Sequence, residues 1–193
     1  MVQKIARVLN VLLMIALVCN IIILYLIPAI VLVYQDSSLL QGVQNYFAAL
    51  LFPGEDDIVM AAYVAPAIIW LNGWFEMDTP HVVLALFLVF SGIQTAIILK
   101  QARRVLATIL RGNPFSIENA VSLNRAAVCC FTIATAALIR VVFSVCHYHS
   151  VQPLASYNAL FVPLFAMAGL LCLVMSALFR QAAELKAEND LTI

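Results

Sequence analysis

The sequence has very little charge for its length. Only 10% of its 193 residues are Asp, Glu, Lys or Arg, whereas 65% are hydrophobic. A soluble domain carries about 25% charged residues, and its folded surface must still be wetted by water. The shortage of charge therefore excludes a water-soluble enzyme, a disordered chain and a domain that contacts nucleic acid directly. The composition instead indicates an integral membrane protein whose main partner is the lipid bilayer.

Motifs for catalysis and metal binding are also missing. The chain has no HExxH, no G-x-S-x-G, no Walker-type phosphate loop and no G-x-G-x-x-G. We therefore expect no enzymatic activity and no cofactor. The five cysteines lie in or beside apolar runs and form no CxxC pair, which indicates small buried side chains rather than disulfides or metal ligands. The acids at 55–57 and the pair His147 and His149 could hold a divalent ion, but we favour the interpretation without a metal site.

Four apolar runs are each long enough to cross a membrane. A crossing helix needs about 20 apolar residues, and the runs cover residues 8–34, 81–99, 126–146 and 154–179. The first run is too long for a cleaved signal peptide and has no A-x-A site at its end. We expect one all-α domain, an integral membrane four-helix bundle, with an outer loop at 35–80, a second loop at 100–125 and a tail at 180–193.

Lys and Arg are absent from the loop at 35–80, which carries six acidic residues. With four crossings, nine of the ten basic residues fall on the opposite side, together with both ends of the chain. Because cytoplasmic loops of membrane proteins are enriched in Lys and Arg, both termini and the loop at 100–125 are expected to be cytoplasmic.

The segment at 58–75 is uncharged over 18 residues and could be counted as a further crossing. A fifth crossing would place basic residues on the wrong side, and Trp70 and Trp74 favour the headgroup level. We interpret this segment as an extracytoplasmic or re-entrant apolar helix between the first two spans. A five-span topology is the alternative.

The second span has a recognisable start and a long continuation. Asp78 or Thr79 can cap it, and Pro80 suits the first helical position. The helical pattern then runs from His81 to Arg111, a length of about 46 Å. Because this length exceeds the hydrocarbon layer of about 30 Å, the helix should protrude or bend along the membrane surface.

A tight turn is expected after this helix. Gly112 suits the position that ends a helix, and Ser116 suits the N-cap of the next one. Phe115 precedes that cap and could pack on Ala120 or Val121 of the new helix. The turn would reverse the chain and lead it into the third span.

Two stretches carry a family resemblance: RGNPFSIEN at residues 111–119 and ELKAENDLTI at residues 184–193. Together they resemble the uncharacterised bacterial family known as domain of unknown function 2975, small four-span proteins of the inner membrane. The resemblance extends from the first span to the end of the chain, and the long apolar segment at 58–75 departs from it. It implies no established activity and suggests a small cytosolic helix-turn-helix transcription regulator as partner. Formation of a homo-oligomer stays open.

The candidate partner-binding residues lie in the basic helix end, the turn and the tail. They are Lys100, Arg103, Arg104, Arg111, Pro114, Phe115, Glu118, Asn119, Glu188, Asn189 and Asp190. The basic residues are either an ordinary positive-inside anchor or a docking surface for anionic lipid or a cytosolic partner. The tail is either a solvated extension of the fourth span or a docked segment. If it docks, opposite charges favour the helix at 100–111 of the same chain.

Arg140 lies inside the third span. A charge in mid-membrane costs about 2.5–3.5 kcal/mol on insertion scales, although Arg140 is only about 9 Å from the outer helix end and can snorkel. Glu76, Asp78 or an Asn or Gln side chain could pair with it. We favour a structural role over a ligand or ion pathway.

Three functions fit these features. We favour a non-enzymatic accessory or regulatory membrane protein that holds the cytosolic regulator. The alternatives are a channel or transporter subunit that uses Arg140 and the outer acids, and an immunity-type protein against membrane-active peptides.

Overall fold

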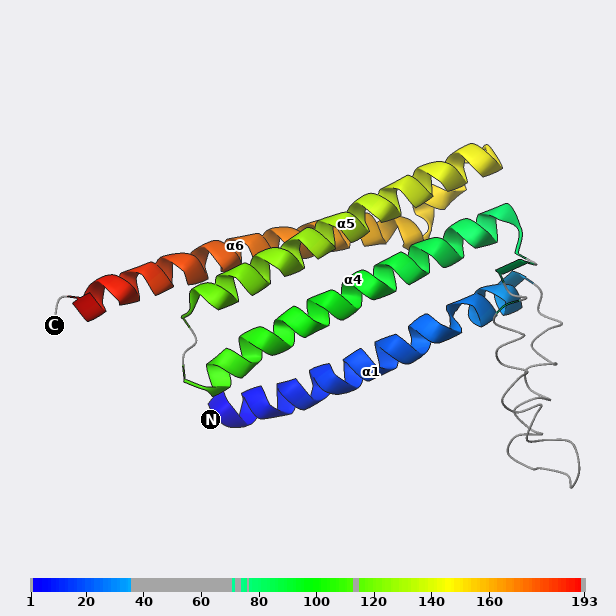
Figure 1. Ribbon diagram of the computed structural model, residues 1–193. Coiled ribbons are helices and arrows are strands. Elements are labelled where there is room, and N and C mark those ends of the chain that lie inside the picture. The colour runs from blue at the N-terminus through cyan, green and yellow to red at the C-terminus, as the bar shows by residue number, and fades with distance from the viewer. Residues whose placement is uncertain (1, 36–70, 72–73, 76, 113–114, 192–193) are drawn as a thin grey trace, which may run out of the picture. The chain divides into compact units, whose positions relative to one another are not determined.

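The computed structural model describes residues 2–35, 71, 74–75, 77–112 and 115–191. The elements in this part of the chain are helical: α1 (Val2–Gln35), α4 (Thr79–Leu110), α5 (Ile117–Tyr148), the short 3-10 helix η1 (Gln152–Ala155) and α6 (Tyr157–Leu191) (Figure 1). The apolar helix expected at 58–75 falls largely outside the described residues.

Four of these helices are long and apolar enough to cross a membrane: α1, α4, α5 and α6. With 32 to 35 residues each, they are about 48–53 Å long. A bilayer with its headgroups measures about 40–45 Å, so each helix reaches beyond the hydrocarbon layer. The chain is thus a multi-pass membrane protein, and the four predicted spans are confirmed as helices.

The chain divides into two compact units. The first unit consists of Met1–Ile22 and Phe90–Ile193, and the second of Ile23–Val89. Helices α1 and α4 each contribute one part to each unit. The candidate site described below lies within the first unit.

An antiparallel hairpin of α5 and α6 dominates the first unit (Figure 1). In the most apolar stretch of α5, 44% of the residues are buried inside the protein, against 6% in that of α6. The hydroxyl of Ser176 on α6 donates to the carbonyl oxygen of Ala120 on α5 at 2.7 Å. Gly169 on α6 lies against the ring of Phe131 on α5. A small residue and an interhelical hydrogen bond therefore hold this pair, as is common between helices in membranes.

The second unit has a small apolar core between α1 and α4. Ile27, Val31 and Leu32 of α1 are buried with Ala85 of α4. The carbonyl oxygen of Asp78 accepts the first backbone hydrogen bonds of α4. Helix α4 thus begins at Thr79, so Pro80, expected at the first helical position, occupies the second.

The turn after α4 follows the sequence prediction closely. Helix α4 ends at Leu110, and Gly112 has the positive φ of 80° that a non-glycine residue rarely adopts. Ser116 is the N-cap of α5, and its hydroxyl accepts a hydrogen bond from the backbone N–H of Asn119 at 3.4 Å. The ring of Phe115 lies 6.0 Å from that of Phe179 on α6, a partner the sequence analysis did not foresee.

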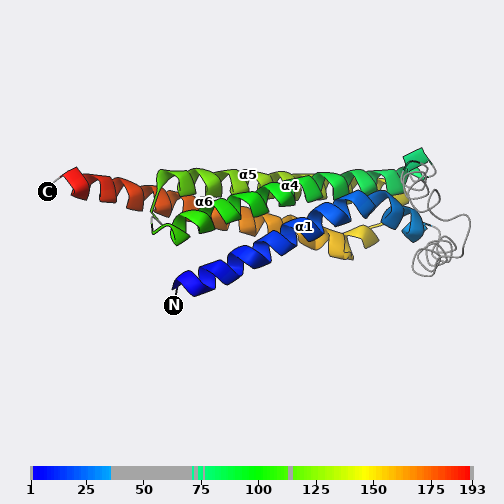
Figure 2. The ribbon, with the colours of Figure 1, turned by 60° about the horizontal axis from the view of Figure 1, so that its bottom comes forward.

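Of the two interpretations of the C-terminal tail, the extension of the fourth span agrees with the structure of residues 180–191. Helix α6 continues without interruption to Leu191, and its end extends past the start of α5 in both views (Figures 1 and 2). The stretch contains neither glycine nor proline, and Arg180 pairs with Glu184 one turn later at 3.1 Å. Such residues continue a helix and do not bend it.

All five cysteines carry free thiols. Cys129 and Cys130 are buried in α5, and Cys172 is partly buried. Cys19 and Cys146 are exposed on their helices, so the expectation of five buried side chains is wrong for these two. On a helix that crosses a membrane, lipid can cover a small apolar side chain as well as protein does.

Candidate functional site

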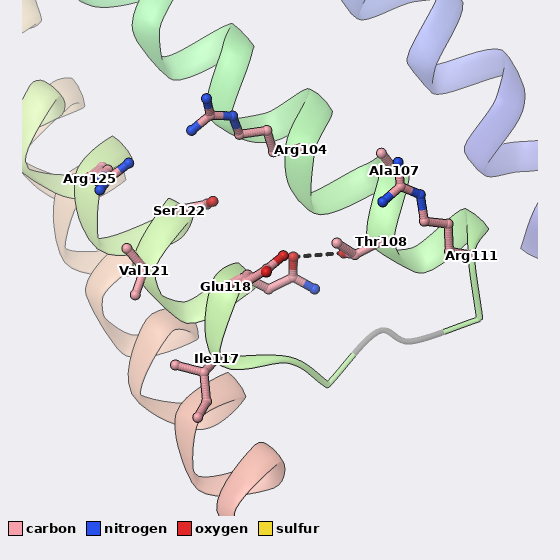
Figure 3. Close-up of a pocket in the computed structure, with 10 residues that line it drawn as sticks. Arg104, Ala107, Thr108, Arg111, Ile117, Glu118, Val121, Ser122 and Arg125 are labelled. Atoms are coloured by element: carbon pink, nitrogen blue, oxygen red, sulfur yellow. Dashed lines mark hydrogen bonds between the residues drawn. The ribbon is translucent and has the colours of Figure 1, made fainter.

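A cavity of 480 Å³ lies between the last two turns of α4 and the first turns of α5 (Figure 3). We call it the arginine pocket. The residues of its lining that matter for its chemistry are Arg104, Thr108, Arg111, Glu118, Asn119, Ser122 and Arg125. They come from α4, from α5 and, in the case of Arg111, from the turn at 111–116 that joins the two helices.

Helical periodicity explains why each helix presents several of these residues to the pocket. Arg104 and Thr108 are four residues apart on α4, Arg111 follows directly after the end of that helix, and Ser122 and Arg125 are three residues apart on α5. Side chains at this spacing share one face of a helix. The reversal of the chain then brings the two faces together.

A polar contact between the helices forms the inner part of the pocket. Asn119 is only 1% exposed, and its Oδ1 atom accepts a hydrogen bond from the Thr108 hydroxyl at 2.7 Å. The same hydroxyl oxygen lies 2.7 Å from the carbonyl oxygen of Val105. Because a buried amide without partners would be destabilising, this contact ties the end of α4 to the start of α5.

The pocket carries an excess of positive charge. Three arginines line it, against the single acid Glu118. Arg104 donates to Oε1 of Gln101 at 3.5 Å, and neither Arg111 nor Arg125 makes an ion pair with any residue that the structure describes. Arg104 and Arg125 extend from opposite helices toward the space between α4 and α5 (Figure 3). Guanidinium groups arranged in this way suit a carboxylate or a phosphate.

Of the predicted partner-binding residues, the structure brings Arg104, Arg111, Glu118 and Asn119 together. The other predicted residues do not line the pocket. Lys100 is exposed on α4, Arg103 is half-buried on the same helix, and Phe115 packs beside Phe179. The three tail residues lie at the C-terminal end of α6: Glu188, Asn189 and Asp190. Pro114 lies outside the described residues.

Arg103 and Arg104 are neighbours in sequence but face different surroundings. The Nε group of Arg103 donates to Oδ1 of Asn10 on α1 at 3.5 Å, whereas Arg104 lines the pocket. This difference follows from the rotation of 100° per residue in an α-helix. Arg103 is therefore a natural control for Arg104.

Three pocket residues were missed as candidates: Thr108, Ser122 and Arg125. Arg125 was counted only among the basic residues of the loop at 100–125. The spacing of Glu118, Ser122 and Arg125 at i, i+4 and i+7 could have identified the shared face of α5.

Arg140 lies near the opposite end of the α5–α6 hairpin. Its Nη1 group donates to Oδ1 of Asn158, near the start of α6, at 3.0 Å. An Asn side chain, one of the partners considered from the sequence, thus contacts Arg140, and Glu76 lies outside the described residues. The contact links α5 to α6.

The histidines at the end of α5 contact aromatic rings. His147 stacks on Phe143 with ring centroids 5.8 Å apart and contacts Tyr148 edge to face at 5.0 Å. His149 follows with a positive φ of 47°. Among the residues placed by the structure, no group of three or more His, Cys, Asp or Glu could hold a metal ion. The acids at 55–57 are outside that set.

No curated protein and no solved structure matches this chain. The family described as "Protein of unknown function (DUF2975)" matches residues 43–193. The match includes α4, α5, α6 and the arginine pocket and begins after α1, although the resemblance seen in the sequence was extended to the first span. Since the match covers well over half of its length, the chain belongs to the DUF2975 family of proteins of unknown function.

Proposed function

We propose that this protein is a non-enzymatic accessory protein of the bacterial inner membrane that holds an acidic cytosolic protein at the turn between α4 and α5. The observation that carries this proposal is the exposed surface of the turn. It combines Arg111, which has no ion pair with a described residue, with the exposed apolar side chains of Phe115 and Ile117. We call these three residues the turn surface.

The position of the turn surface supports a role in water. Ile117 precedes Ala126, where the third apolar run begins, by nine residues, or about 13 Å along a helix. Phe115 is 50% exposed and Ile117 is 60% exposed. Apolar side chains exposed beside an arginine are the usual chemistry of a protein-binding surface.

The distribution of charge supports a cytoplasmic location for this surface. The loop at 100–125 and both ends of the chain hold nine of the ten basic residues. By the positive-inside rule, both termini and the turn surface then face the cytoplasm.

A small transcription regulator with an acidic face is the partner we favour. The membrane protein would sequester it, and a change in the helices or in the outer loop at 35–80 would alter the exposure of the turn surface and release it. This role needs no chemical reaction and no cofactor.

Site-specific photocrosslinking in cells tests the proposal. A photoreactive amino acid at position 117 should capture a soluble protein, and the same adduct should be lost in Arg111→Glu. Arg180→Glu is the matched control, because Arg180 is an exposed arginine on α6 outside the turn surface. Crosslinks to lipid alone, or an adduct that persists in Arg111→Glu, would contradict the proposal.

The hydrogen bond between Arg140 and Asn158 supports a structural role for Arg140 rather than a transport pathway. Polar contacts between membrane helices typically contribute about 0.6 kcal/mol, with larger values near 1.7 kcal/mol. The channel alternative predicts that Arg140→Leu abolishes ion flux in liposomes. The accessory role predicts only a change in stability.

A further inference from the structure

A second hollow lies on the membrane-spanning part of α5. It is an apolar groove of 420 Å³ whose lining includes Phe90 on α4 and Val128, Thr132, Ala136 and Ile139 on α5. We call it the apolar groove. The groove carries no charged residue, in contrast to the arginine pocket.

The arginine pocket and the apolar groove follow each other along one face of α5. Val121 and Arg125 line the pocket, and Val128, Thr132 and Ile139 line the groove. Successive members are three, four or seven residues apart, so they share one face of the helix. Arg125 and Val128 are separated by three residues, or about 4.5 Å of helix.

Helix α4 shows the same order of polar and apolar residues. Arg104 lines the pocket, and Phe90 lines the groove 14 residues earlier. On α5 the groove residue Ile139 follows the pocket residue Arg125, also by 14 residues. Charged residues thus lie at one end of the α4–α5 face and apolar residues at the other.

The dimensions of this face match one leaflet of a bilayer. Val128 and Ile139 are 11 residues apart, or about 16 Å along the helix. Half of the hydrocarbon layer measures about 15 Å. Arg125 directly precedes the third apolar run and Arg104 lies five residues, or about 7.5 Å, beyond the second. Both arginines therefore lie at the depth of the lipid headgroups, which extend about 5–8 Å beyond the hydrocarbon.

We propose that the arginine pocket and the apolar groove form one binding site for an anionic phospholipid. The phosphate group lies between the guanidinium groups of Arg104 and Arg125, and one acyl chain lies in the apolar groove. Arginine binds phosphate oxygens through charge-assisted, often bidentate hydrogen bonds. The site explains why two arginines on facing helices have no acidic partner within hydrogen-bond distance in the described structure. Arg111 and Ile117 of the turn surface also line the pocket, but the phosphate ligands Arg104 and Arg125 are not part of the turn surface, and the site does not depend on the orientation in the membrane.

Native mass spectrometry of the full-length protein tests the headgroup half of the site. We expect the detergent-purified protein to retain phosphatidylglycerol over phosphatidylcholine with the same acyl chains. Arg104→Gln with Arg125→Gln should lower the affinity for phosphatidylglycerol at least about tenfold, since about 1.4 kcal/mol of lost contact suffices. Arg103→Gln is the control and should bind as wild type, because Arg103 faces Asn10. Equal retention of the two lipids, or unchanged binding in the double variant, would overturn the proposal.

A second set of variants tests the acyl half. Ala136→Phe should fill the groove and weaken phosphatidylglycerol binding, whereas Leu138→Phe, on an exposed position outside the groove, should not. Val128→Trp should likewise weaken phosphatidylglycerol binding. Val128 is already 55% exposed, so this variant is expected to fold even if Ala136→Phe disturbs packing. Circular dichroism measures the melting temperature of both variants, and a variant that melts as wild type does shows that its change in lipid binding comes from the groove and not from unfolding.

A competition experiment with a soluble phosphate compound distinguishes a lipid-binding site from a site for free phosphate compounds. Glycerol 3-phosphate carries the same phosphate chemistry without acyl chains, so millimolar concentrations should fail to displace phosphatidylglycerol. If glycerol 3-phosphate displaces the lipid and Val128→Trp binds the lipid as wild type does, the site is one for a soluble phosphate compound and the lipid proposal is refuted.

Discussion

The contact between Gly169 on α6 and Phe131 on α5 predicts that even a small side chain at position 169 will disturb the hairpin. A Cβ atom added to Gly169 would lie 3.1 Å from Cε2 and Cζ of Phe131 and 3.2 Å from Cε1. Ordinary contacts between carbon atoms are about 3.5–4.0 Å. The ring or the helix would therefore have to move by a few tenths of an ångström.

Two opposing effects set the size of the change. Replacing glycine by alanine inside a helix is intrinsically favourable by about 1 kcal/mol, while overpacking costs about 1–3 kcal/mol. For Gly169→Ala we expect a net loss of about 0–2 kcal/mol. Gly169→Val adds two further methyl groups at the same contact and should lower the free energy of unfolding by about 2–3 kcal/mol.

Reversible unfolding in mixed micelles, followed by circular dichroism as the fraction of SDS rises, measures these changes. Ala177→Val is the matched control, because Ala177 is exposed on the same helix two turns later. Phe131→Ala removes the ring atoms that would clash, so the double variant Phe131→Ala/Gly169→Val should show a favourable coupling of about 1 kcal/mol or more.

The reasoning is refuted if Gly169→Val is no less stable than Ala177→Val. It is also refuted if removal of the Phe131 ring does not relieve the effect of valine. Either result would mean that α5 and α6 are not packed closely at this level.

Three further predictions concern the turn and Arg140. Gly112 has a φ of 80°, so Gly112→Ala should lower the melting temperature through a loss of about 1 kcal/mol. Gly112→Asn should lower the melting temperature less. Equal stability of the two variants would argue against the left-handed turn. Ser116→Ala removes the N-cap of α5 and should lower the free energy of unfolding by about 1 kcal/mol. Hydrogen exchange in the first turn of α5 should then be faster than in wild type, whereas in Ser116→Asp the same amides should stay protected. Asn158→Leu removes the 3.0 Å contact of Arg140 and should be more destabilising than Arg140→Leu/Asn158→Leu, because a charge in the membrane that loses a polar contact is more costly than no charge. The reverse order in thermal unfolding would exclude a structural pair.

Much of the fold could be predicted from local properties of the sequence. A membrane helix is identified by the length and hydropathy of a single segment, because all its backbone hydrogen bonds are internal. Gly112 and Ser116 were likewise assigned from local chemistry, since a left-handed residue and an N-cap need only their immediate neighbours. The structure agrees with the sequence at these positions.

The open points were those where the outcome depends on distant residues. The sequence left open whether the tail extends the fourth span or docks, and the uninterrupted helix formers at 180–191 continue α6 to Leu191. Phe115 was expected to pack on Ala120 or Val121, and the structure adds Phe179 on α6 as a neighbour. Contacts of this kind cannot be ranked from the sequence without knowing where the other helix lies.

By itself, the sequence determined that the chain is a membrane protein, where its four long apolar helices lie and where the chain turns between α4 and α5. These properties follow from hydrophobic length and from backbone preferences within a few residues. Only the tertiary structure decided which arginines share a pocket, that Arg103 faces Asn10 while Arg104 does not, and which residues line the apolar groove. The reason is physical: a site between helices depends on their relative rotation and approach, which side-chain packing sets and local preference does not.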